Sequence, residues 1–174
     1  MNKSFRIENI LENDQNTVVE IISRLWGDAT IVVHGEFFYV ADLPGLKAIL
    51  EDQIVGILHY RIEGKECEIL TLASLVEGQG IGSTLLETLE SIALTANCEK
   101  LSLTTTNDNL HALGFYQRRG FHLVKLYPGQ VSEARKIKPG IPLVGDFNIP
   151  IRDELKLEKP IKHTINGKKI ETSA

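Results

Sequence analysis

Apolar residues recur at two different spacings along the chain, and the spacing predicts the elements. In the first third, a short strand-like run precedes apolar residues at helical spacing, which indicate a helix that Gly27 ends. Three apolar runs separated by short polar turns follow, as is typical of an antiparallel meander. The segment 31–40 is apolar and aromatic but has a polar interruption, and it reads as a strand or an ordered loop. We expect a strand at 5–10, a helix with apolar positions at 18, 19, 22, 25 and 26, and strands at 46–51, 54–62 and 67–76.

The pattern changes after residue 80. Helical spacing returns, and a strand, a second helix and further strands follow. We expect a helix with apolar positions at 85, 86, 89, 92, 93 and 96, a strand at 101–105, a helix at 109–119, a strand at 121–127, a loop-rich segment at 128–150 with one helical turn at 131–138, and a last strand at 151–161. This order predicts an α/β (α+β) fold, with a mixed and mostly antiparallel sheet flanked by helices in a single domain, 1–174. Near the end, Asn166-Gly167 signals a hairpin turn, and a polar tail over 162–174 is the alternative.

Composition narrows the class of protein. The 174 residues, 43% hydrophobic and 24% charged, suit one globular domain, and the net charge of −4 argues against a nucleic-acid partner. No apolar run approaches the length of a membrane span, and the N-terminus lacks the apolar core of a signal peptide. We therefore expect a cytoplasmic protein with no membrane partner. The histidines and cysteines lack the spacing of metal ligands, so we expect no metal.

Three alternating glycines, Gly78, Gly80 and Gly82, end an apolar run just before a helical pattern. Glycine lets the backbone approach a ligand, and the unpaired N–H groups of a helix start attract anions, so the turn predicts a phosphate cradle. A Walker A string is absent, and the spacing departs from a dinucleotide fingerprint. The acyl-coenzyme A pyrophosphate loop, Q/R-x-x-G-x-G/A, fits at both glycine positions, although Glu77 replaces its first residue. The alternative is a turn whose glycines only permit close packing.

A second motif lies downstream, after a helix and a strand. Residues 109–121, Asn-Leu-His-Ala-Leu-Gly-Phe-Tyr-Gln-Arg-Arg-Gly-Phe, resemble the N-x-x-A-x-x-F-Y-x-x-x-G-F signature of the GNAT family of N-acetyltransferases. The order of the two motifs also matches that family, and the resemblance covers residues 54–127. It implies a GNAT-like acyl-CoA N-acyltransferase fold. It also implies transfer of an acetyl group from acetyl-CoA to a primary amine, by direct attack in a ternary complex.

The resemblance assigns residues to an acetyl-CoA site. The pantetheine arm would lie against residues 68–74, and the diphosphate would lie on the N–H groups of 78–83, with a hydroxyl added by Ser83. Asn109 would hold the pantetheine arm or cap its own helix, and the two roles can coexist. The cofactor-binding residues implied by the resemblance are Leu70, Leu72, Gly78, Gln79, Gly80, Ile81, Gly82, Ser83 and Asn109.

The resemblance also implies two catalytic residues. Tyr116 matches the family's general acid, since a phenol with a pKa of about 10 stays protonated at neutral pH and can protonate a departing thiolate. The alternative is a tyrosine that only packs. Glu68 resembles the base of the histone-modifying branch, and strict alternation places it on one face with Glu66, Leu70 and Leu72. The alternative is a solvated charge at a strand edge, and many relatives have no single base.

The resemblance also implies that the acceptor is a small-molecule amine or a peptide or protein amine. The segment 31–42 falls where the family binds its acceptor, and it offers His34, Glu36, Tyr39 and Asp42. For each of them the alternative is a partly exposed strand. The segment 128–150 would cover the acceptor site or make a contact in a homodimer. Two other functions stay open: a non-catalytic acyl-CoA-binding regulatory module, and a nucleotide-binding protein of another fold.

Overall fold

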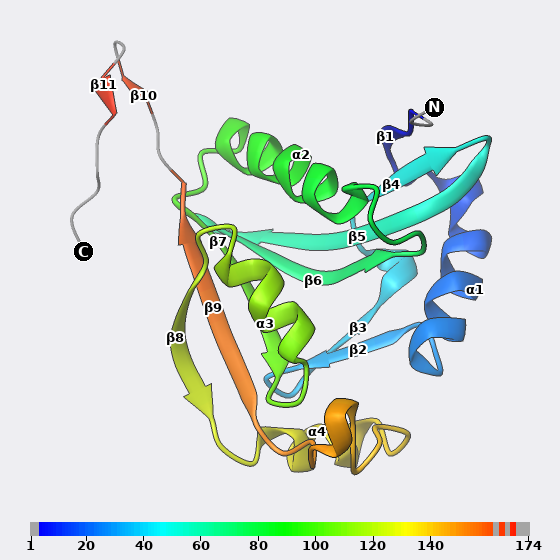
Figure 1. The fold of residues 1–174 in the computed structure, drawn as a ribbon, viewed down its shortest axis with the longest axis vertical. Helices are drawn as coiled ribbons and strands as arrows, with labels where there is room; N and C mark the ends of the chain where they lie inside the picture. The colour runs from blue at the N-terminus through cyan, green and yellow to red at the C-terminus, as the bar shows by residue number, and fades with distance from the viewer. Residues whose placement is uncertain (1–3, 162–163, 166–167, 170–174) are drawn as a thin grey trace.

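A seven-stranded sheet forms the centre of the molecule (Figure 1). The computed structural model describes residues 4–161, 164–165 and 168–169. The strands lie in the order β1-β4-β5-β6-β7-β9-β8, and every neighbouring pair is antiparallel except the parallel pair β6–β7. Their bounds are Arg6–Asn9 for β1, Gly45–Leu50 for β4, Gln53–Glu63 for β5, Glu66–Ser74 for β6, Lys100–Thr106 for β7, His122–Tyr127 for β8 and Glu154–Pro160 for β9. The predicted mixed, mostly antiparallel sheet is confirmed.

Helices pack on both faces of this sheet. In the described residues, the four α-helices are α1 (Gln15–Trp26), α2 (Ile81–Thr95), α3 (Leu110–Gln117) and α4 (Gln130–Ile137), with 3-10 turns at Glu12–Asp14, Val40–Asp42 and Asp146–Asn148. Leu85 of α2 and Tyr116 of α3 are buried in one apolar cluster with Leu58 of β5. Ile22 of α1 is buried in a second cluster with Ile57. Because successive strand residues point to opposite faces, α2 and α3 cover one face and α1 covers the other.

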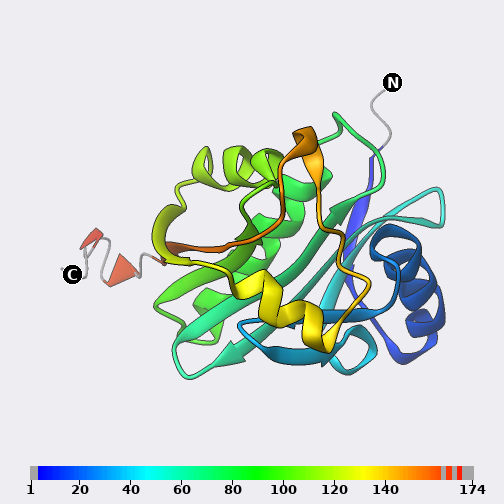
Figure 2. The ribbon, with the colours of Figure 1, turned by 90° about the horizontal axis from the view of Figure 1, so that it is seen from below.

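Residues 30–39 form a separate hairpin of β2 (Thr30–Val33) and β3 (Glu36–Tyr39). His34 and Gly35 make the turn with positive φ angles of 51° and 81°, which accounts for the polar interruption in an apolar run. A hairpin thus replaces the single strand or loop expected at 31–40. Figure 2 shows α4 (yellow) beside β2 (blue), and the two are in contact.

The parallel strands β6 and β7 part along their length. Their pairing ends at Ile69↔Leu103, although both strands continue beyond this point. Past Ile69, the edge of β6 that faces β7 has no strand partner among the described residues. The sheet therefore has an opening at its centre.

A β-bulge at Leu70 interrupts β6 at the level of this opening. The register between β5 and β6 shifts by one residue here, and the alternation of faces shifts with it. Leu72 pairs with Leu58 and packs in the cluster under α2, whereas Glu66 and Glu68 point away from that cluster. The prediction that Glu66, Glu68, Leu70 and Leu72 share one face is wrong, because strict alternation does not allow for the bulge.

The C-terminal part differs from the prediction at the start of the last strand. The last strand begins at Glu154 rather than at residue 151, because the Asn107 side chain accepts the backbone N–H groups of Arg152 and Asp153. Further on, β10 (Thr164–Ile165) and β11 (Lys168–Lys169) pair antiparallel. Residues 166–167, on which the hairpin prediction rests, lie outside the described residues. Within the described part of the chain, no helix has the length and apolar character needed to cross a membrane.

Candidate active site

A cleft of about 920 Å³ occupies the opening between β6 and β7. Leu70, Thr71 and Leu72 of β6 and residues 103–106 of β7 line its middle. We call its two ends the α3 side and the β2–α4 side. The α3 side is lined by Glu77, Gly82, Asn109, His111, Ala112, Phe115, Tyr116 and Arg118, and the β2–α4 side by Trp26, Thr30, Ile31, Val32, Val33, Val131, Ala134, Lys138, Ile141 and Glu154.

The glycine turn presents backbone to the α3 side. Gly78 and Gly80 have φ angles of 73° and 75°, a left-handed conformation that glycine adopts without strain. Gly80 caps α2, so the N–H groups of the first helical turn point out of the helix without internal acceptors. The Ile81 side chain is buried, so this residue offers the turn only its backbone. Gln79 is exposed, and Gly82 lines the cleft.

Arg119 joins this turn to α3. Its guanidinium donates from Nη2 to the Ser83 hydroxyl (2.6 Å) and from Nη1 to the Phe115 carbonyl (2.8 Å). It also stacks on the Phe115 ring, 3.6 Å from the centroid. The Ser83 hydroxyl, which was predicted to bind phosphate, therefore accepts a hydrogen bond from Arg119 and keeps this cation beside the start of α2. The backbone N–H groups and this cation together suit an anionic ligand.

Asn109 and Tyr116 place α3 against the cleft. The Asn109 side chain accepts the Ala112 N–H (3.0 Å), so its predicted capping role is confirmed. Tyr116 is only 6% exposed, and its ring packs edge-on against Phe115 and Phe121. Burial raises the pKa of the Tyr116 phenol above its ordinary value, more than Arg119 lowers it. The phenol is therefore protonated at neutral pH.

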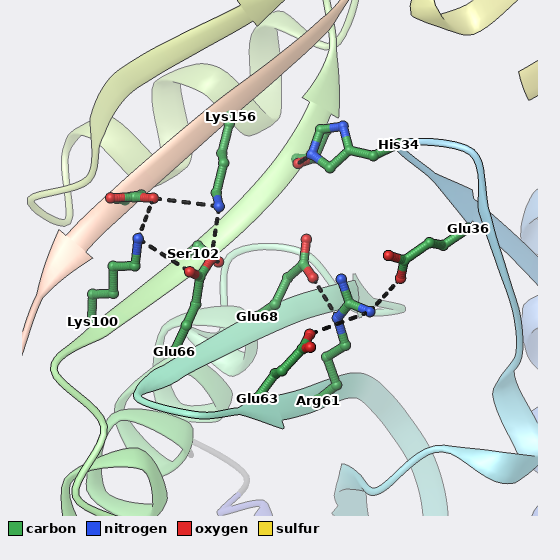
Figure 3. A network of polar contacts seen from close by, with 11 residues as sticks. His34, Glu36, Arg61, Glu63, Glu66, Glu68, Lys100, Ser102 and Lys156 are labelled. Carbon is green, nitrogen blue, oxygen red and sulfur yellow. Dashed lines mark hydrogen bonds and ion pairs between the residues drawn. The ribbon is translucent and has the colours of Figure 1, made fainter. Parts of the chain in front are cut away.

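Glu68 lies in a different environment. Arg61 donates to it from Nε (2.7 Å) and also pairs with Glu36 (Figure 3). Glu68 lines a separate pocket of about 240 Å³, with His34, Arg61, Glu63, Glu66 and Lys156, and is not among the residues that line the larger cleft.

Glu66 belongs to the same network and ties β6 to its neighbours. It contacts Ser102 and Lys100 of β7 and Lys156 of β9 (Figure 3). Burial opposes its charge, but the bonds from Lys156, Ser102 and Lys100 outweigh burial and lower the pKa of Glu66 to about 2. These contacts hold β6, β7 and β9 together next to the opening.

The residues predicted to bind the acceptor lie in different places in the structure. His34 does not line the cleft but contacts two residues that do, with Nε2 2.9 Å from the Thr104 hydroxyl and Nδ1 2.8 Å from Glu154. Glu36 pairs with Arg61, away from the cleft. Tyr39 is exposed on β3 opposite Thr30, and it does not line the cleft. Asp42 lies in a 3-10 turn.

Glu154 was missed by the sequence analysis. It begins β9, is 3% exposed, and lines the cleft. Burial raises the pKa of its carboxyl, against the opposing effect of His34. Burial also lowers the pKa of His34. In the sequence Glu154 is one charge in the alternating run Glu-Leu-Lys-Leu-Glu, and nothing local separates it from its solvated neighbours.

Comparison with known proteins identifies the family. The model of the acetyltransferase (GNAT) family matches residues 11–121, more than half of the chain. Two Bacillus subtilis proteins are similar to this chain over most of its length. YdhI is 38% identical over 84% of this chain and 92% of its own length, and YxbD is 42% identical over 85% of this chain and 94% of its own length. Its fold resembles that of an IAA acetyltransferase from Bacillus cereus, with a TM-score of 0.67 and 19% identity over 90% of this chain and 99% of that one. It also resembles a B. subtilis acetyltransferase solved with CoA, with a TM-score of 0.65 and 16% identity over the same shares. This chain belongs to the GNAT family of acetyltransferases.

Proposed function

We propose that this protein transfers an acetyl group from acetyl-CoA to a primary amine, by direct attack while both substrates are bound. The observation that carries the proposal is the cleft through the opening between β6 and β7, with walls on both faces of the sheet. Such a cleft lets a donor and an acceptor approach one carbon from opposite sides. Attack in that geometry needs no covalent intermediate on the protein.

The α3 side fits acetyl-CoA. The N–H groups at the start of α2, with Arg119 beside them, would hold the diphosphate. The unpaired edge of β6 at Leu70 and Leu72 would hold the pantetheine arm, and Asn109 lines the same space. When bound, acetyl-CoA supplies a thioester whose sulfur is the leaving group. Glu77, which replaces the usual first residue of the loop motif, is exposed, so the backbone carries most of this site.

Tyr116 is the proposed proton donor to the departing sulfur. It lines the α3 side of the cleft, and burial keeps its phenol protonated. The resemblance assigns the proton acceptor to Glu68. Its contact with Arg61 and its place outside the cleft lining weigh against that role.

The test is a thiol-release assay with acetyl-CoA over a panel of amines, beside calorimetry with acetyl-CoA. We expect binding and amine-dependent release of free thiol. Binding without release on any amine would favour a regulatory acyl-CoA-binding module. Tight nucleotide binding without CoA binding would contradict both functions.

A further inference from the structure

The β2–α4 side of the cleft is apolar. Its walls come mainly from Trp26, Ile31, Val32, Val33, Val131, Ala134 and Ile141. One cation lies there, but the Lys138 ammonium already binds the Thr30 carbonyl (2.9 Å) and Asp28 (2.8 Å). Among the residues that line this side, Glu154 is the one carboxylate.

The two oxygens of Glu154 have different surroundings. Oε2 accepts the backbone N–H of His34 (3.2 Å) and lies 2.8 Å from the His34 ring at Nδ1. Within the described part of the chain, Oε1 takes part in no hydrogen bond or ion pair. Glu154 therefore has one oxygen fixed by the hairpin turn and one left for a ligand.

His34 holds Glu154 in place without neutralising it. The Thr104 hydroxyl can donate to Nε2, which leaves the proton of a neutral ring on Nδ1, the nitrogen that lies 2.8 Å from Glu154 Oε2. The Tyr127 ring packs against His34, with ring centroids 4.1 Å apart. The other charged groups near this pair are Glu68 of β6, Lys156 of β9 and Glu36 of β3.

We propose that the acceptor is a primary amine on an apolar body, and that Glu154 Oε1 takes its proton. This rests on the proposed acetyl transfer. A polyamine or an aminoglycoside carries several cations and needs several free carboxylates, whereas this side of the cleft offers one. Glu68 is the other carboxylate close to His34 and Glu154, but the Arg61 guanidinium already neutralises its charge.

Glu154 takes one proton from the ammonium form of the acceptor, which frees the lone pair that forms the new N–C bond as the C–S bond breaks. Tyr116 gives its phenol proton to the departing sulfur and regains one from the acylated nitrogen. One proton in all leaves the site, through Glu154.

The test compares Glu154→Gln with Glu158→Gln. Glu158 is on the same strand, and its carboxylate pairs with Lys100 and Lys156 outside the cleft. The glutamine at 154 keeps the side-chain size and an oxygen for His34 but cannot take a proton. We expect Glu154→Gln to lower kcat/KM at pH 7 by about 100-fold and to replace the acidic limb set by the Glu154 carboxyl with one set by the acceptor ammonium. Acetyl-CoA affinity stays unchanged, and Glu158→Gln keeps wild-type kcat/KM.

Raising the pH separates a base from a structural residue. Above the pKa of the acceptor ammonium the amine is already neutral, so the Glu154→Gln defect should shrink. A defect that is the same at every pH contradicts the base role, as does wild-type activity of Glu154→Gln. The same change of the acidic limb in Glu68→Gln instead would transfer the role to Glu68. If the wild type releases no thiol with any amine, the proposed function fails, which is a different result.

The acceptor class is tested with the wild type alone. Hexylamine and phenethylamine carry one amine on an apolar body, and spermidine carries several amines. We expect kcat/KM to be at least about tenfold higher for the first two, because the apolar wall binds their bodies. A preference for spermidine would overturn the apolar acceptor.

Discussion

The α3 side and the β2–α4 side of the cleft are assembled in different ways. The first comes from one stretch of chain, from Glu77 in the glycine turn to Arg118 after α3. The second brings together the end of α1, the hairpin at 30–39, α4 and Glu154, which are far apart in sequence. The α3 side is thus formed by local structure, whereas the β2–α4 side depends on how distant segments pack.

The two sides also differ chemically. Backbone N–H groups and Arg119 make the α3 side suited to anions, and apolar side chains with one buried carboxylate make the other side suited to a single amine. A substitution on one side should therefore alter the handling of one substrate and spare the other. The changes below test that separation, in order of decreasing effect.

Tyr116→Phe should have the largest effect. It removes the phenol proton and leaves the ring packed between Phe115 and Phe121. We expect kcat to fall by about 100-fold while the Kd for acetyl-CoA and the KM for the amine stay close to wild type. Steady-state kinetics and calorimetry measure these quantities. Unchanged turnover would remove the proton-donor role.

Gly80→Ala should weaken the binding of acetyl-CoA on the α3 side and leave the binding of the amine unchanged. An alanine at φ 75° is strained by about 1 kcal/mol, and relaxation of the turn would move the N–H groups away from the diphosphate. We expect the Kd for acetyl-CoA to rise by about tenfold, with the amine KM little changed. Gly64→Ala is the matched control, because Gly64 also has a positive φ (57°) and open space at its Cβ but lies in the β5–β6 turn. Equal loss of affinity in both variants would show a general effect of strain.

Glu66→Gln should affect stability and neither substrate. Its lowered pKa, about 2 against an ordinary 4.5, gives stability that is present above about pH 4.5 and lost as the pH falls towards 2. Partial exposure reduces the contribution to about 1–2 kcal/mol at pH 7. Denaturant unfolding at pH 7 and at pH 3 measures it, and the difference from wild type should be smaller at pH 3. Glu63→Gln, at an exposed residue, is the control, and an equal loss there would contradict the account.

The contrast between the two sides also explains what the sequence could predict. Asn109 as a cap, the glycine turn and the order of strands follow from local signals, and the structure confirms the cap and the sheet. The faces of Glu68 and Leu72 were not predictable, because a one-residue bulge at Leu70 changes the alternation. Glu154 looks like any charge in an alternating strand, and only the packing of the hairpin against β7 and β9 buries it.

The most direct test of the central claim is the initial rate of thiol release as a function of both acetyl-CoA and amine concentration. A cleft that holds both substrates across one opening predicts double-reciprocal lines that intersect, because both must be bound before the acetyl group moves. Parallel lines would indicate a covalent acetyl-protein intermediate and would contradict direct attack in the opening between β6 and β7.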